Sequence, residues 1–261
     1  MVDMEIRNVI VLSKGQDIPI LESLEKRRVH YDRVQGYLAS PDDFEGRDLV
    51  ITFGGDGTVL DASKNILDEV PVLAVKSSDE SVGALCQADA DDFEHVIDSI
   101  LDGSYVTEKW SRVEGSLGEE SGTALNEIFA GPRYSSGPGR YVLSLNQLRE
   151  EQRGSGIVVS TGTGSGGWYR NIPGSFGAFP RTSGKLRFIA RDCGSDHGYS
   201  LMRGVLERGD ELEIESMIKF DGTVDFDGYN RKAIDFPRGS VLSVRLSENP
   251  LTMIIPEKNY K

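Results

Sequence analysis

An acidic residue stands among glycines in Gly54-Gly55-Asp56-Gly57-Thr58, directly after the apolar stretch 48–53. Glycines let a backbone approach a ligand closely, and the start of a following helix favours an anion. A carboxylate would repel a phosphate in a simple cradle. It makes sense if Asp56 accepts a proton from a hydroxyl that attacks a phosphoryl group, or if it holds Mg²⁺. The alternative is a turn in which Asp56 caps the next helix.

A second glycine cluster lies in SGIVVSTGTGSGGWYRNIPG, residues 155–174. Gly162, Gly164 and Gly167 formally spell the G-x-G-x-x-G of a Rossmann turn, but no apolar helix follows and Pro173 interrupts soon. The interleaved hydroxyls favour a polar loop that contacts a ligand, and a flexible β-turn is the alternative. These hydroxyls belong to Ser160, Thr161, Thr163 and Ser165.

A polar pair, Asn126-Glu127, interrupts the apolar segment TALNEIFAGP. Buried polar groups need partners. The pair either binds a ligand or ties two strands together, and the sequence leaves both options open.

The first hundred residues alternate between strand and helix patterns. Continuous apolar runs at 7–13, 48–53 and 70–75 predict parallel strands that are buried on both faces. Residues 58–69 have apolar side chains at roughly helical spacing. The pattern predicts a βαβ unit with the glycine cluster at its first βα turn.

The clearest predicted helix follows in DDFEHVIDSILDGSY. Asp91 and Glu94 resemble a capping box, and Gly103 suits the end of the helix.

After about residue 105 the pattern changes to short strands with turn dipeptides, such as Ser121-Gly122 and Asp227-Gly228. Strands are expected at 139–146, 156–161, 185–191, 210–216 and 240–247. We therefore predict an α/β N-terminal domain with a parallel sheet over residues 1–107 and a β-rich C-terminal domain over 108–261. A further option is that the C-terminal segment packs back on the first domain.

The composition limits the classes of partner. The 261 residues are 38% hydrophobic and carry a net charge of −13, which disfavours binding to nucleic acid or to an anionic membrane. There is no run of 18 apolar residues, so we expect no membrane span. The N-terminal MVDMEIRNVIVLS has no basic segment before an apolar core, which predicts no secretion signal.

The two cysteines, Cys86 and Cys193, are far apart and lack metal-ligand spacing, so reduced thiols are expected. The three histidines are scattered, which disfavours a histidine metal site or a Ser-His-Asp triad.

Taken together in this order and spacing, GGDGT, Asn-Glu, Ser-Thr-Gly-Thr-Gly-Ser and Phe-Asp-Gly resemble the NAD kinases. That family belongs to the superfamily of diacylglycerol kinases, sphingosine kinases and 6-phosphofructokinases, and GGDGT alone marks only the superfamily. The closing segment, Asp225–Ile255, also fits the family pattern, so the resemblance spans about residues 7 to 255.

Three positions depart from the commonest bacterial pattern. Ser155-Gly156 stands for Asp-Gly, Trp168 stands where that pattern has Tyr, and Lys76 stands for Asn. These variants resemble a divergent branch that includes mitochondrial NAD kinases. Lys76 would lower the pKa of Asp56 or contact a phosphate, and the alternative is a solvated lysine at a strand end.

The resemblance implies that the 2′-hydroxyl of the adenosine ribose of NAD attacks the γ-phosphoryl group of ATP, or of another donor such as polyphosphate, and gives NADP. Asp56 would take the proton, and Mg²⁺ bound with ATP would neutralise the triphosphate. No resident metal ligands are assigned. The implied binding residues are Gly54, Gly55, Gly57, Thr58, Lys76, Asn126, Glu127, Ser155, Thr161, Thr163, Ser165 and Trp168. Trp168 would stack on adenine or nicotinamide or would serve only in packing.

Two other functions are weighed beside this one. A lipid or sphingoid-base kinase of the same superfamily should show an apolar or basic membrane face, which the acidic composition disfavours. A non-catalytic NAD(P)-sensing protein is the second, and the intact GGDGT argues against it. The resemblance also implies a homodimer or homotetramer, and a cytoplasmic location is expected.

Overall fold

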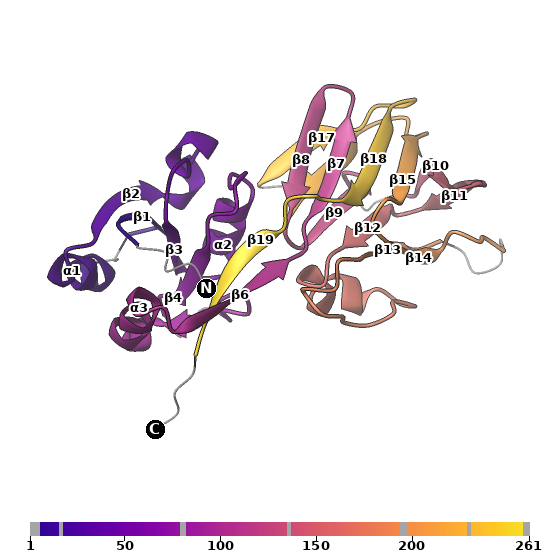
Figure 1. The fold of residues 1–261 in the computed structure, drawn as a ribbon. Coiled ribbons are helices and arrows are strands. Elements are labelled where there is room, and N and C mark those ends of the chain that lie inside the picture. The colour runs from indigo at the N-terminus through magenta and orange to yellow at the C-terminus, as the bar shows by residue number, and fades with distance from the viewer. Residues whose placement is uncertain are drawn as a thin grey trace. The chain divides into compact units, whose positions relative to one another are not determined.

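The computed structural model describes residues 6–15, 18–78, 82–134, 137–193, 198–228 and 231–257. The chain divides into two compact units, each described by itself below (Figure 1). Unit 1 comprises Met1–Lys109 and Asn249–Lys261, and unit 2 comprises Trp110–Glu248. The boundary expected between residues 107 and 108 falls inside strand β6 (Tyr105–Trp110).

Unit 1 is built on a seven-stranded sheet in the order β2-β1-β3-β4-β19-β6, with β5 paired to β4. The pairs β1–β2, β1–β3, β3–β4, β4–β5 and β4–β19 are parallel. The remaining strands are β1 (Asn8–Ser13), β2 (His30–Gln35), β3 (Leu49–Gly54), β4 (Val72–Lys76), β5 (Ala88–Asp89) and β19 (Leu251–Pro256). The three predicted parallel strands are confirmed as β1, β3 and β4, whose side chains are almost all buried.

Three α-helices accompany this sheet: α1 (Ile18–Lys26), α2 (Asp56–Ser63) and α3 (Phe93–Leu101). The βαβ prediction is confirmed by β3, α2 and β4. The expected helix over 58–69 was too long, because α2 ends at Ser63, while Ile66 is buried beyond its end.

The helix at 91–103 is confirmed as α3, and Gly103 follows it with a positive φ of 74°. The capping box was wrong: the N-cap is Asp92, without a side-chain cap hydrogen bond, and a short 3₁₀ turn, η3 (Ala90–Asp92), precedes the helix.

Unit 2 consists of two six-stranded antiparallel sheets. Their orders are β11-β10-β15-β18-β7-β8 and β14-β13-β12-β9-β16-β17. The first sheet holds β7 (Val113–Leu117), β8 (Glu120–Ala124), β10 (Gly139–Leu145), β11 (Leu148–Gly154), β15 (Glu211–Ser216) and β18 (Val241–Leu246). The second holds β9 (Glu127–Pro132), β12 (Ile157–Ser160), β13 (Leu186–Ala190), β14 (Arg203–Leu206), β16 (Gly222–Phe226) and β17 (Lys232–Asp235).

The two sheets share one apolar core. It combines side chains such as Leu143 and Ile214 of the first sheet with Val159 and Phe188 of the second. The alternating burial of β15 and β18 is typical of antiparallel strands with one face on a core. All five strands expected in this region are confirmed, as β10, β12, β13, β15 and β18. The turn expected at Ser121-Gly122 was wrong, because both residues lie inside β8.

No helix in the described ranges is both long enough and apolar enough to cross a membrane.

The core of unit 1 gives a prediction about β19. Ile254 is 0% exposed and packs in the unit 1 core, whereas its neighbour Ile255 is partly exposed. Ile254→Ala should lower the free energy of unfolding by about 2–5 kcal/mol, because it removes buried methyl groups and leaves a cavity. Ile255→Ala is the matched control and should cost clearly less. Urea denaturation of both variants checks this, and equal losses would contradict the placement of β19.

Candidate active site

The acidic residue of the glycine loop is fixed at the junction of β3 and α2. Gly54 ends β3, Gly55 is the N-cap of α2, and Asp56 is the first helical residue. The alternative in which Asp56 caps the helix is wrong, because the N-cap position is occupied by Gly55. Instead, Oδ1 of Asp56 accepts a hydrogen bond from the backbone N–H of Leu85 at 2.8 Å. The carboxylate is therefore oriented by a backbone group from a distant segment.

Gly54 is required by close packing with Thr58. A Cβ atom at Gly54 would collide with Oγ1 of Thr58. Thr58 is 1% exposed, and its Oγ1 is buried without a hydrogen-bond partner among the residues that the structure describes. The loop therefore turns tightly over this side chain, and any larger residue at Gly54 would force Thr58 or the loop to shift.

Lys76 meets the same loop from the neighbouring strand. It lies in register with Gly54 across β3 and β4, and the N–H of Ser77 donates to the Gly54 carbonyl at 3.1 Å. These residues lie at the carboxyl ends of parallel strands, where open α/β sheets bind ligands.

Cys86, which was expected only to be a reduced thiol, also lies beside this loop, with its Sγ 3.9 Å from the Gly54 carbonyl oxygen. Burial, together with the nearby Asp56 and Asp89, raises the pKa of its thiol to about 11, and Lys76 opposes them. The thiol therefore stays protonated near neutral pH.

In unit 2, Asn126 and Glu127 are held through their backbone by Asp227. The Asp227 carboxylate accepts the N–H of Leu125 at 2.9 Å, of Asn126 at 2.7 Å and of Glu127 at 3.2 Å. Asp227 follows β16 and is 7% exposed. Sequence reasoning treated Asp227-Gly228 as a turn and as part of a family pattern but gave Asp227 no role. In the sequence, the place of Asp227 in the family pattern was the signal that it matters. No residue near it along the chain indicates its hydrogen-bond partners.

Thr161 holds the same segment from the other side. Its hydroxyl donates to the Leu125 carbonyl at 2.5 Å, and its N–H donates to the Asn126 carbonyl at 2.9 Å. These bonds, with those to Asp227, satisfy the backbone groups of the segment. Within the described ranges, the Asn126 and Glu127 side chains have no hydrogen-bond partner.

The other hydroxyls of the second glycine cluster mostly shape their own loop. Ser165 donates to the Gly162 carbonyl at 2.7 Å and accepts the N–H of Phe179 at 3.0 Å. Thr163 Oγ1 is buried without a partner among the described residues. Two 3₁₀ turns follow, η4 (Gly164–Gly166) and η5 (Tyr169–Asn171), so the chain lacks the helix that a Rossmann turn needs.

The partly buried Glu127 and the buried Asp227 are two acidic residues of this segment. Desolvation and the negative charge of Asp227 together raise the pKa of Glu127 to about 8, and Arg231 opposes them. Burial also raises the pKa of Asp227 to about 6, against the three backbone N–H donors and Arg231, which lower it.

Two of the predicted site residues lie apart from this cluster. Ser155 precedes β12, whereas Thr161 follows it, so the two lie at opposite ends of that strand. The Trp168 ring, 38% exposed, packs 5.5 Å from the Phe129 ring, and the Arg191 guanidinium lies 5.0 Å from its centroid. Trp168 is thus engaged in packing on one face and open on another.

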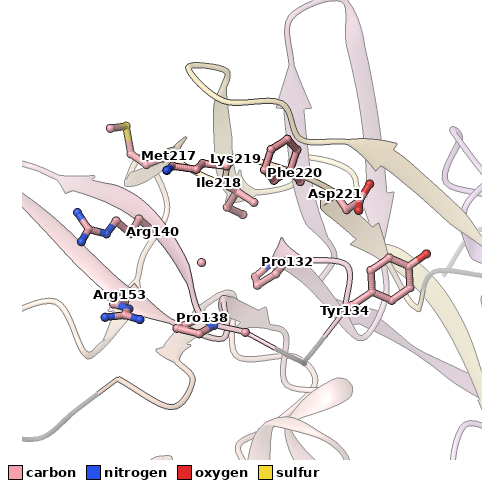
Figure 2. A pocket seen from close by; sticks show the side chains of 12 residues that line it. Pro132, Tyr134, Pro138, Arg140, Arg153, Met217, Ile218, Lys219, Phe220 and Asp221 are labelled. Atoms are coloured by element: carbon pink, nitrogen blue, oxygen red, sulfur yellow. The ribbon is translucent and has the colours of Figure 1, made fainter.

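A pocket of about 440 Å³ in unit 2 contains none of the predicted site residues. Figure 2 shows Arg140 and Arg153 on one side of it, and Tyr134, Phe220 and Asp221 on the other. The two arginines lie directly opposite each other in register across β10 and β11.

Comparisons with known proteins agree with the sequence resemblance. The family model described as "ATP-NAD kinase N-terminal domain" matches residues 7–105. A protein of Oryza sativa subsp. japonica named "Probable NADH kinase" is 30% identical over 240 residues, which cover 82% of this chain and 73% of that protein.

Two solved structures share the fold. An NAD kinase from Archaeoglobus fulgidus in complex with ATP gives a TM-score of 0.79 at 22% identity, over 96% of this chain and 94% of that chain. A yeast NADH kinase complexed with NADH gives a TM-score of 0.79 at 16% identity, over 98% of this chain and 85% of that chain.

The close packing around Gly164 gives a prediction. A Cβ there would lie 2.6 Å from Oε2 of Glu127 and would also collide with the Asn126 carbonyl. Gly164→Ala should therefore lower the free energy of unfolding by about 1–3 kcal/mol, because the segment must shift. A Cβ at Gly166 meets no atom within 4 Å, so Gly166→Ala is the matched control and should be nearly neutral. Urea denaturation measures both, and a neutral Gly164→Ala would contradict this packing.

Proposed function

The chain belongs to the NAD kinase family, and from that premise we propose that it makes NADP by transferring a phosphoryl group from ATP to the 2′-hydroxyl of the adenosine ribose of NAD. The assignment of Asp56 as the residue that takes the proton rests on one observation. Asp56 lies in the glycine loop at the carboxyl ends of parallel strands, with one carboxylate oxygen fixed by Leu85.

Asp56 is the proton acceptor in this proposal. Its Oδ1 is engaged by the Leu85 N–H, and among the described residues nothing donates a hydrogen bond to Oδ2. Oδ2 takes the proton from the 2′-hydroxyl as the hydroxyl oxygen bonds to the γ-phosphorus. The bond between that phosphorus and the β–γ bridging oxygen breaks, and ADP leaves.

The glycine loop and Lys76 would hold the phosphates. Gly55 and Gly57 flank Asp56 at the first turn of α2, where backbone N–H groups and the helix dipole favour an anion. Lys76, beside Gly54 in register, supplies a positive charge. A Cβ at Gly54 is excluded by Thr58, so these two residues set the shape of the loop.

Mg²⁺ would enter with the triphosphate. Among the described residues no group of three carboxylate, histidine or cysteine side chains could hold a metal ion. This donor set fits an ion whose ligands come mainly from phosphate oxygens and water. When bound, the ion neutralises charge on the transferred group.

The dinucleotide would be recognised by Asn126 and Glu127, whose side chains are not committed elsewhere within the described ranges. Thr161, Thr163 and Ser165 would shape the loop beside them, and the open face of Trp168 would stack on a planar ring. Ser155, at the far end of β12, would contribute only to a more distant part of the ligand. Self-association as a homodimer or homotetramer and a cytoplasmic location stay predictions.

Asp56→Asn tests the proton acceptor. The amide keeps the shape of the side chain but cannot take the proton, so kcat for NADP formation should fall by about 10²–10⁴-fold. NAD affinity, measured by calorimetry without ATP, should stay nearly unchanged. Asp68→Asn, at an exposed acid beyond α2, is the control and should keep full activity. Normal turnover by Asp56→Asn would remove Asp56 from this role.

Removing divalent metal tests the nature of the magnesium site. Excess EDTA should abolish NADP formation, and Mg²⁺ should restore it, whereas the melting temperature should not change. A large fall in melting temperature with EDTA would indicate a resident structural metal and contradict the proposal. Running the assay with ATP, other triphosphates and polyphosphate identifies the donor. Phosphorylation of a lipid, or NAD binding without any transfer, would support the two other functions instead.

A further inference from the structure

We propose that the pocket of about 440 Å³ in unit 2 is a second ligand site, and that it binds a phosphate group attached to a planar ring, the chemistry of a mononucleotide. None of the residues assigned above to ATP or NAD lines it. Pro132, which does, is the last residue of β9, whereas Glu127 is the first, about 16 Å away along the strand. The volume lies within the range of small-molecule sites. The inference goes beyond the proposed function, because this site takes no part in the transfer to NAD.

The pocket lies where the chain passes between the two sheets of unit 2. Its upper wall in Figure 2 is formed by Met217–Asp221, which lead from β15 to β16. Its lower wall includes Tyr134 and Pro138, which lie between β9 and β10. The N–H of Met217 donates to the Arg140 carbonyl at 2.9 Å, so a backbone hydrogen bond fastens the upper segment to β10.

The apolar part of the lining is closely packed. Ile218 is buried and belongs to the core of unit 2. A Cβ at Gly139 would lie 3.1 Å from Ile218 and 3.2 Å from Pro132, so the missing side chain lets these residues pack closely. The depth of the pocket is therefore set by the packing of the core.

Basic side chains concentrate on one side of this pocket, although the chain has a net charge of −13. Arg140 and Arg153 lie directly opposite each other in the antiparallel register of β10 and β11, where like charges destabilise the pair. In Figure 2 the amine of Lys219 points toward the same side. Glu151 approaches Arg140 at 3.5 Å, a contact between exposed side chains that contributes little. Within the described ranges the side chains of Arg153 and Lys219 have no acidic partner, so a bound phosphate would relieve the repulsion.

Two exposed rings lie across the pocket from these charges (Figure 2). Phe220 is 82% exposed and Tyr134 is 63% exposed. Large exposed apolar side chains beside a cavity are typical of ligand sites, and their flat faces can stack on a planar ring. Asp221, the acid among the described lining residues, also lies on this side, away from the basic ends. A ligand with a phosphate at one end and a ring at the other therefore uses both sides.

Calorimetric titration with AMP in the presence of saturating NAD tests this site. NAD fills the proposed dinucleotide site, and the variants described below distinguish the pocket from the ATP site. Adenosine lacks the phosphate and should bind at least about tenfold more weakly than AMP, because it gives up hydrogen bonds to charged groups. Inorganic phosphate lacks the ring and should also bind more weakly than AMP. Raising the salt concentration should weaken AMP binding and leave adenosine binding nearly unchanged.

Charge-neutralising variants locate the bound AMP. Arg153→Gln and Lys219→Gln should each weaken AMP binding by about tenfold, because each removes a charged donor to the phosphate. Arg149→Gln is the matched control: Arg149 is also exposed on β11, but it pairs with Glu215 and does not line the pocket, so AMP affinity should not change. All three altered side chains are exposed, so the melting temperature should stay the same.

Phe220→Ala tests the ring separately. It should weaken AMP binding by about threefold and leave the binding of inorganic phosphate unchanged. The same variant distinguishes a ligand site from a contact with a second copy of the chain. If its oligomeric state changes and its AMP affinity does not, the exposed rings belong to a subunit interface and the proposal is wrong.

Two further results would overturn the inference: no binding of AMP once NAD is saturating, or the same loss of affinity in Arg149→Gln as in Arg153→Gln. Failure of the proposed function is distinguishable from either. It would show as absence of NADP formation by the wild-type protein, with AMP binding still sensitive to Arg153→Gln.

Discussion

A single buried carboxylate, that of Asp227, organises the candidate site of unit 2. Three consecutive backbone N–H groups converge on it from a segment about a hundred residues away along the chain. A buried charge is tolerated only when hydrogen bonds compensate its desolvation, and the three donors would in turn be unsatisfied without it. Thr161 donates to the carbonyl groups of Leu125 and Asn126, and the N–H of Asp227 donates to that of Glu127. The main chain of the segment is thus satisfied on both sides, whereas the Asn126 and Glu127 side chains have no hydrogen-bond partner within the described ranges.

Unit 1 uses the same principle with a different result. Asp56 is also held by a backbone N–H from a distant segment, but only one of its oxygens is engaged. Oδ2 of Asp56 has no donor among the described residues, whereas both oxygens of Asp227 accept backbone N–H groups. The two carboxylates thus differ in how many N–H donors hold them, although both occur in Asp-Gly sequences.

The sequence predicted those features that depend on local pattern. Strands β1, β3 and β4 are buried on both faces and read as apolar runs, and α3 has a regular apolar face. The edge strand β2 escaped prediction because its sequence, HYDRVQ, is mostly exposed and carries no such run. The end of α2 was missed because Ile66 is buried by tertiary packing beyond the helix, which spacing alone cannot distinguish from a helical position. Asp227 could not be given its role, because nothing near it in sequence indicates partners at Leu125–Glu127.

The acidic composition makes the local arrangement of charge decisive. A chain with a net charge of −13 has no general attraction for a triphosphate or a dinucleotide, so its binding sites depend on nearby groups. In unit 1 the groups proposed for this are the start of α2 and Lys76, which lies in register with Gly54. In unit 2 the compensation takes another form, because three backbone N–H groups accompany the cation Arg231 around the buried charge of Asp227. Backbone donors hold this charge in place without a long, flexible side chain, which a lysine would introduce.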